Sequence, residues 1–101
     1  MIRFLLIISL AAGFGTAQAQ ELDPAAMQVL AAPCANCHGP DGHSPGAIPS
    51  ISGLPEADAV ERMLAFRNDA DPGATIMPRL MKGYDEAQIR ALARWFAEIG
   101  Q

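Results

Sequence analysis

The two cysteines of this 101-residue chain lie three positions apart and are followed directly by a histidine, in the run Cys34-Ala35-Asn36-Cys37-His38. A disulfide between residues i and i+3 closes so short a loop that it constrains the unfolded chain very little. A redox-active CxxC of the thioredoxin type opens a helix within a βαβ unit, and no β-branched strand pattern surrounds this motif. A zinc site that added His43 would lack the usual two-knuckle spacing of its ligands.

The histidine directly after the second cysteine favours a different interpretation. C-x-x-C-H is the attachment signature of c-type haem. Two thiols one helical turn apart can add to two vinyl groups on one side of a porphyrin, and the next histidine then binds the iron. We predict that Cys34 and Cys37 hold one covalent haem c and that His38 is the proximal iron ligand. A thiol–disulfide protein without haem is the remaining alternative.

The first nineteen residues predict a secretory signal peptide. Arg3 is followed by an apolar run from Phe4 to Ala12 and then by Ala17-Gln18-Ala19, an A-x-A cleavage pattern. The apolar run is too short to span a bilayer. We expect residues 1–19 to be cleaved and residues 20–101 to form one mature domain in the periplasm. A buried N-terminal helix and an uncleaved membrane anchor are the alternatives.

The mature domain is small and acidic. Removing 19 of the 101 residues leaves 82, and the loss of Arg3 leaves six basic against eleven acidic side chains, a net charge of −5. Such a domain has no electrostatic reason to bind nucleic acid or an anionic membrane surface. We therefore expect no nucleic-acid partner and no stable membrane span. A domain of this size also needs a filler for its core, which a haem supplies.

The sequence predicts an all-α fold with three to four helices and long loops around the haem. Asp23 is the expected N-cap of a first helix that Pro24 begins, and Pro33 is expected to end or kink it. Residues 39–54 are so rich in glycine and proline that a loop is expected there. This loop is expected to wrap the proximal face of the haem, with the Pro49 carbonyl as the candidate acceptor for the free ring N–H of His38.

Two further helices follow in the sequence. The first is expected from about residue 56 to residue 68, and residues 69–83 are expected to be irregular. The last helix has a capping-box pattern in Asp85 and Gln88. Its apolar stripe contains Ile89, Leu92, Ala93, Phe96 and Ile99. Trp95 and Phe96 are expected to pack on the haem or on the N-terminal helix.

The distal iron ligand is expected from the irregular segment before the last helix. Met77 is the predicted ligand and Met81 is the alternative; thioether ligation raises the reduction potential relative to two imidazoles. His43 follows His38 too closely to reach the distal face. An open sixth position would instead make the chain a haem-based ligand sensor or a peroxidase-like enzyme.

Three polar side chains follow Met77 in the same segment. Arg79, Lys82 and Tyr84 are candidates for contacts with a haem propionate or with a partner protein. The equally simple interpretation is that they are solvated loop residues.

Two stretches of the chain carry a resemblance to a known family. The stretch C-A-N-C-H-G-P-D-G, with the later P-S-I-S-G-L, resembles the class I cytochrome c family. The stretch A-T-I-M-P-R-L-M-K-G-Y, followed by D-E-A-Q-I-R-A-L-A-R-W-F, is similar to the cytochrome subunit of flavocytochrome c sulfide dehydrogenase. The resemblance implies that Cys34 and Cys37 are thioether attachment points, His38 the proximal ligand and Met77 the distal ligand.

The same resemblance implies a role. It implies one-electron transfer by a cytochrome subunit that forms a heterodimer with an FAD-containing sulfide dehydrogenase subunit and passes electrons to a soluble acceptor. The FAD is expected only in the partner, because no paired carboxylates, nucleophile–base arrangement or phosphate loop is recognisable in this chain. Many such subunits carry two haem domains, whereas this sequence contains one CxxCH motif. A free-standing soluble electron carrier is the alternative.

Overall fold

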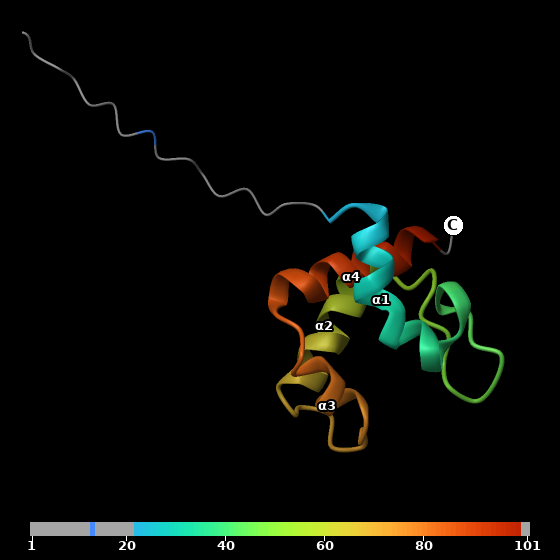
Figure 1. Ribbon diagram of the computed structural model, residues 1–101. Coiled ribbons are helices and arrows are strands. Elements are labelled where there is room, and N and C mark those ends of the chain that lie inside the picture. The colour runs from blue at the N-terminus through green and yellow to red at the C-terminus, as the bar shows by residue number, and fades with distance from the viewer. Residues whose placement is uncertain (1–12, 14–21, 100–101) are drawn as a thin grey trace, which may run out of the picture.

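The computed structural model describes Gly13 and residues 22–99, and every regular element in these residues is a helix (Figure 1). The predicted signal peptide lies outside the described residues apart from Gly13. Four α-helices and one 3-10 turn occur in the order α1 (Pro24–His38), η1 (Pro40–Gly42), α2 (Glu56–Arg67), α3 (Met77–Met81) and α4 (Glu86–Ile99). The predicted all-α class is confirmed.

Helix α1 begins as its sequence predicts but does not end at Pro33. The Asp23 side chain accepts a hydrogen bond of 2.8 Å from the Ala26 backbone N–H, and Pro24 occupies the first turn. The helix continues through Pro33 and carries the whole CxxCH motif to His38. Proline removes one helical hydrogen bond, and packing of α1 against α4 on both sides of Pro33 offsets this loss. Ala31 and Cys34 both belong to that contact.

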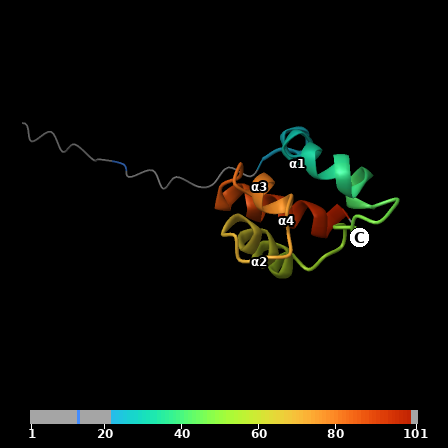
Figure 2. The same cartoon turned by 90° about the horizontal axis from the view of Figure 1, so that it is seen from below.

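Helix α4 is the centre of the molecule. It packs against both α1 and α2, and α2 also packs on α3, whereas no Cα atom of α1 comes within 8 Å of α2 or α3. Figure 2 shows α4 between α1 and α2. The α1–α4 contact is built from residues one helical turn apart on each helix: Met27 and Ala31 on α1, Leu92 and Phe96 on α4. The predicted apolar stripe of α4 is therefore a core face.

The start of α4 confirms the predicted capping box. The Gln88 backbone N–H donates to Asp85 Oδ1 at 2.8 Å, and the Asp85 backbone N–H donates to Gln88 Oε1 at 2.9 Å. Trp95 is partly buried against the α1–α4 core, and Phe96 lies within it. The aromatic pair thus packs on the N-terminal helix, one of its two expected positions.

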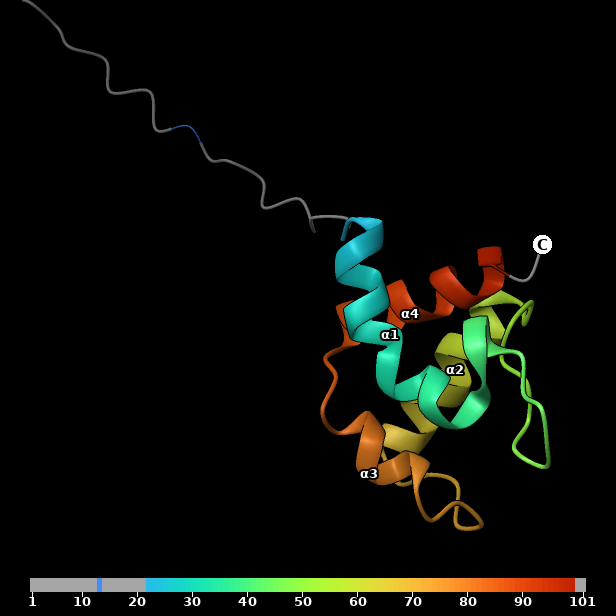
Figure 3. The same ribbon diagram turned by 45° about the vertical axis from the view of Figure 1, so that its right-hand side comes forward.

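Two short elements appear where the sequence predicted irregular backbone. Residues 40–42 form the 3-10 turn η1, which contacts α1 and α4. Residues 77–81 form α3, which packs on α2. Figure 3 shows α3 and the loop after η1 at separate edges of the molecule. One helical turn carries too few residues for a clear periodic signal, and tertiary contacts decide its conformation.

No helix in the described part of the chain is both long and apolar enough to cross a membrane.

Candidate haem site

The CxxCH motif occupies the last two turns of α1. Because α-helical residues three apart lie on neighbouring positions of one face, Cys34 and Cys37 face the same side of α1, and His38 is the last helical residue. Cys34 is half-buried and Cys37 is exposed, and both are free thiols. Burial raises the pKa of the Cys34 thiol, and a backbone hydrogen bond acts in the opposite direction.

The backbone turns sharply at Gly39, directly after His38. Gly39 has φ +89° and ψ 165°, a conformation that only glycine adopts readily. A Cβ atom at this position would lie 1.8 Å from the His43 carbonyl oxygen. The turn leads the chain into η1 and keeps the following loop beside the end of α1.

The loop after η1 is fixed to two elements that are already packed. The Ile51 N–H donates to the Gly42 carbonyl at 2.8 Å, and the Gly53 N–H donates to the Phe96 carbonyl near the end of α4 at 2.9 Å. These bonds bring the Pro49 carbonyl oxygen to 2.5 Å from His38 Nδ1. The predicted acceptor is therefore confirmed.

This hydrogen bond determines the tautomer of His38. A carbonyl oxygen can only accept, so Nδ1 carries the proton and donates it to Pro49. The other ring nitrogen, Nε2, then keeps a free lone pair, which is the form of neutral imidazole that binds a metal. The site presents one imidazole nitrogen for ligation, directly after the two thiols.

His43 lies apart from this arrangement. Its side chain is exposed, and its Nδ1 is 3.1 Å from Ser52 Oγ within the loop. It is an exposed loop histidine, and its short separation from His38 keeps it away from α3.

The two candidate distal methionines differ in burial. Met81 is one of the most deeply buried side chains in the described residues, with 2% of its surface exposed. Met77, the first residue of α3, is only half-buried. A buried core side chain cannot turn toward an added group without leaving a cavity, so of the two Met77 is the sulfur that remains available.

Four large apolar side chains of the loop after η1 and of the distal segment are partly exposed to solvent. Ile48 and Leu54 come from the loop after η1, and Ile76 and Leu80 come from the distal segment; all four are exposed by 40% or more. A flat apolar ring bound to the two thiols could cover such side chains. The residues present therefore fit a haem. Ile51 of the same loop packs on the α1–α4 core.

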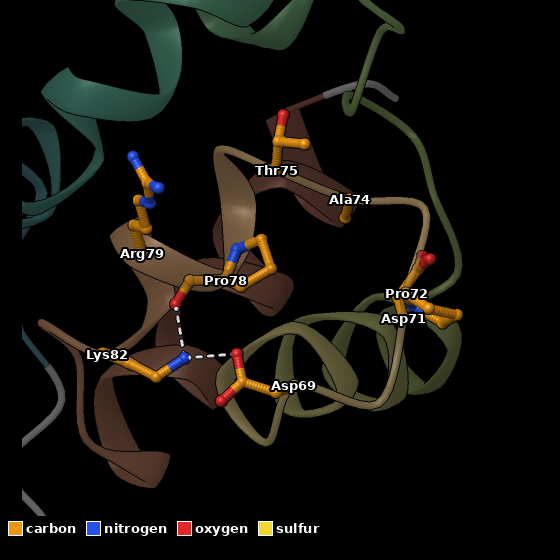
Figure 4. A pocket seen from close by; sticks show the side chains of 8 residues that line it. All are labelled: Asp69, Asp71, Pro72, Ala74, Thr75, Pro78, Arg79 and Lys82. Carbon is orange, nitrogen blue, oxygen red and sulfur yellow. Dashed lines mark hydrogen bonds and ion pairs between the residues drawn. The ribbon is translucent and has the colours of Figure 1, made fainter.

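The hollow drawn in Figure 4 is a different place. This cavity of about 370 Å³ is lined by residues between Asp69 and Lys82 and includes none of the thiols, His38 or Met77. It lies within the segment that joins α2 to the end of α3.

Two candidate polar residues of the distal segment make contacts within the protein. Lys82 Nζ donates to Asp69 Oδ1 at 2.6 Å and to the Pro78 carbonyl at 3.2 Å. The Tyr84 hydroxyl donates to the Leu30 carbonyl on α1 at 3.3 Å. Burial raises the pKa of Tyr84, and the charge of a Cys34 thiolate adds to this effect. Sequence reasoning missed Asp69, because its partner lies thirteen residues away and no local pattern marks such a pair.

Comparison with known proteins gives two matches. Residues 17–99 match the model of the family described as cytochrome c. The chain is also similar to the cytochrome subunit of sulfide dehydrogenase from Chlorobaculum tepidum, with 34% identity over 74 residues, or 73% of this chain. The aligned part spans 66% of that relative's own length, slightly less than two thirds. The family implies covalent haem c, and Cys34 and Cys37 have the CxxCH spacing for it. The chain therefore belongs to the cytochrome c family of electron carriers.

Proposed function

We propose that this chain carries single electrons in the periplasm through one haem c, held by Cys34 and Cys37 and ligated by His38 and Met77. The observation that carries the proposal is the hydrogen bond from His38 Nδ1 to the Pro49 carbonyl. It orients the imidazole and leaves Nε2 free at the end of the helix that bears both thiols.

Each side chain of the site has a defined task in this proposal. Cys34 and Cys37 hold the porphyrin through two thioether bonds, so that the group cannot dissociate. His38 supplies the proximal nitrogen, and the fixed Nδ1 proton raises its basicity as a ligand. Haem c, when bound, supplies an iron that alternates between the ferric and ferrous states. Exposed apolar side chains of the loop after η1, such as Ile48 and Leu54, would be available to cover the ring and exclude water from it.

Met77 is the proposed distal ligand, and the contrast with Met81 supports this choice. Met81 fills the core beneath α3, whereas the Met77 side chain is available. A thioether ligand favours the ferrous form relative to a second imidazole and therefore raises the reduction potential.

The test of this ligand uses two matched substitutions. Met77→Leu removes the thioether and should abolish the near-infrared methionine–iron charge-transfer band of the oxidised protein. Met81→Leu replaces a core methionine by a leucine of similar volume and should lower the stability by less than about 1.5 kcal/mol. This variant should keep the band. Loss of the band only in the Met81 variant would show that Met81, and not Met77, is the distal ligand. A wild-type protein without the band would support the ligand-sensor alternative.

We further propose that the chain is the cytochrome subunit that accepts electrons from an FAD-containing sulfide dehydrogenase subunit. The similarity to the Chlorobaculum tepidum subunit supports this role. In the proposed heterodimer the flavin takes electrons from sulfide and passes them singly to this chain, and a soluble acceptor receives them next.

Native purification from the source organism tests both parts of the proposal. We expect a complex that contains one copy of this chain with its leader removed, one covalent haem and one FAD-bearing chain, measured by native mass and cofactor content. A monomer that never copurifies with a flavoprotein would contradict the subunit role and leave a free-standing electron carrier. A chain without Soret absorption, with a mass lacking one haem, would contradict the haem assignment itself.

A further inference from the structure

The element that presents Met77 cannot hold its own position. Helix α3 has five residues and no side-chain hydrogen bond at its N-cap, Ile76. A single helical turn is unstable in isolation because nucleation fixes several residues for few hydrogen bonds. The location of the Met77 sulfur therefore depends on contacts between α3 and the rest of the molecule.

One side chain joins α3 to the end of α2. Lys82 Nζ donates to the carbonyl oxygen of Pro78, the residue directly after Met77, and to Asp69 Oδ1 beyond the end of α2 (Figure 4). Figure 4 also shows the Arg79 side chain directed away from this pair. Lys82 thus links the backbone next to the proposed ligand to a residue just beyond the end of another helix.

Asp69 occupies a position where aspartate carries a local cost. Its φ of +55° lies in the left-handed region. The Ala70 N–H donates to the Ala65 carbonyl at 2.8 Å, and the Asp69 N–H donates to the Phe66 carbonyl at 3.1 Å. This pair of bonds is the Schellman arrangement that ends a helix, in which the left-handed residue is usually glycine. Glycine would therefore end this helix at least as well as Asp69 does.

One role explains both the left-handed conformation of Asp69 and its ion pair with Lys82. We propose that Asp69 and Lys82 form a clamp that holds Met77 at the iron, so that both are positioning residues for the distal ligand. This inference rests on the proposed ligation by Met77. An exposed ion pair contributes little to global stability, and the lysine and aspartate side chains are 49% and 67% exposed. The clamp should therefore act on the ligand much more than on the fold.

The measurement is the affinity of the ferric haem protein for imidazole, which competes with Met77 for the iron. The apparent affinity rises with the fraction of molecules whose methionine has left. We expect Asp69→Gly and Lys82→Met each to tighten imidazole binding by about twofold to fivefold, the upper part of the range for an exposed ion pair. The double variant should bind imidazole no more tightly than the stronger single variant, because both changes remove one clamp.

Two control variants make the same chemical changes elsewhere. Asp41→Gly replaces another aspartate of left-handed φ, +54°, in the described residues. Arg90→Met breaks the 2.7 Å ion pair with Glu86 on α4, where both side chains are similarly exposed. Both controls should bind imidazole as the wild type does.

A stability measurement separates positioning from a merely structural role. Unfolding by denaturant is followed in saturating imidazole, where Met77 is displaced in every variant. Glycine is the favoured residue at the Asp69 position, so Asp69→Gly should unfold at a denaturant concentration no lower than that of the wild type.

Three outcomes would overturn the proposal in distinguishable ways. Wild-type imidazole affinity in Asp69→Gly and Lys82→Met, with the methionine band present, would refute the clamp and leave Met77 as the ligand. A lower unfolding midpoint of Asp69→Gly in saturating imidazole would assign the pair a structural role. Absence of the methionine band in the wild type would overturn the ligand and the clamp together.

Discussion

The two proposed iron ligands lie on elements that are held in very different ways. His38 ends a fifteen-residue helix that is capped by Asp23, packed on α4 and hydrogen-bonded through the imidazole to a fixed loop. Met77 begins a five-residue helix without a side-chain cap, which packs on α2, buries Pro78 and Met81, and is joined to Asp69 by an exposed ion pair. His38 is itself only half-buried, as Met77 is, but its helix packs on α4 and its ring is hydrogen-bonded to the Pro49 carbonyl. We therefore expect the distal ligand to be lost more easily than the proximal one.

The largest expected effect compares the two ligands directly. His38→Ala should prevent a folded one-haem protein from accumulating, because the proximal bond and the end of α1 are lost together. Met77→Ala should leave the covalent haem in place and open the sixth position. The checks are the intact mass, which reports attached haem, and the visible spectrum, which reports the ligands. A folded His38→Ala protein that carries one haem and is low-spin would contradict this expectation.

The second-largest expected effect concerns the packing around the two helices that carry the ligands, α1 and α3. Leu92 of α4 is fully buried in the α1–α4 core, and Leu92→Ala should lower the free energy of unfolding by about 3 kcal/mol through lost burial and a cavity. Leu80 of α3 is 40% exposed, and Leu80→Ala should change this free energy by less than about 1 kcal/mol. Denaturant titration measures both changes. Equal losses would show that α3 is as much a part of the core as α4.

A backbone substitution tests how firmly the chain is held after His38. Gly39→Ala should destabilise the protein by about 2 kcal/mol, because the new Cβ meets a backbone carbonyl and the left-handed φ is strained. Gly46 lies in the same loop with no atom within 4 Å of a Cβ position, so Gly46→Ala should change stability by at most about 0.5 kcal/mol. Thermal unfolding of both variants gives the comparison. Similar melting temperatures would contradict it.

The smallest expected effect concerns the hydrogen bond by which the distal segment reaches α1. Burial raises the pKa of Tyr84 above its ordinary 10.0. The native state therefore holds this proton more tightly than the unfolded state. The resulting stability is complete below pH 10 and is lost as the pH rises through the native pKa. Because Tyr84 is the sole tyrosine, ¹³C-tyrosine NMR reports it alone.

The native resonance of Tyr84 should titrate above pH 10, and the resonance of the protein in denaturant should titrate near pH 10. Tyr84→Phe is the control: it should remove this part of the pH dependence of stability. Identical titration in the native and denatured protein would show that the hydroxyl is not held by α1.

Local signals in the sequence predicted the elements that are held locally. The Asp23 cap and the Asp85–Gln88 capping box each involve residues three positions apart, so their pattern is visible in the sequence. The apolar stripe of α4 follows the helical period: Ile89, Leu92, Ala93 and Phe96 are buried as expected, and Ile99 is partly buried. The thiols and His38 were recognisable because covalent attachment demands a fixed spacing.

Elements that depend on distant contacts could not be predicted in this way. Pro33 is a local signal to stop a helix, yet α1 continues because it packs on a helix that lies more than fifty residues later in the chain. Helix α3 forms on α2, and the bond between Lys82 and Asp69 joins residues thirteen apart. Periodicity and composition carry no trace of such pairings.

The central position of α4 also determines when the protein can fold. The helix that unites α1 with α2 is the last of the described elements to be synthesised. Until it is made, the helix bearing the two thiols has no long-range helical partner in the described residues, and short helices are marginal alone. A chain that is still being synthesised thus remains open, with both cysteines accessible. Under the proposed haem attachment, this order leaves both thiols free to react before the fold encloses the porphyrin.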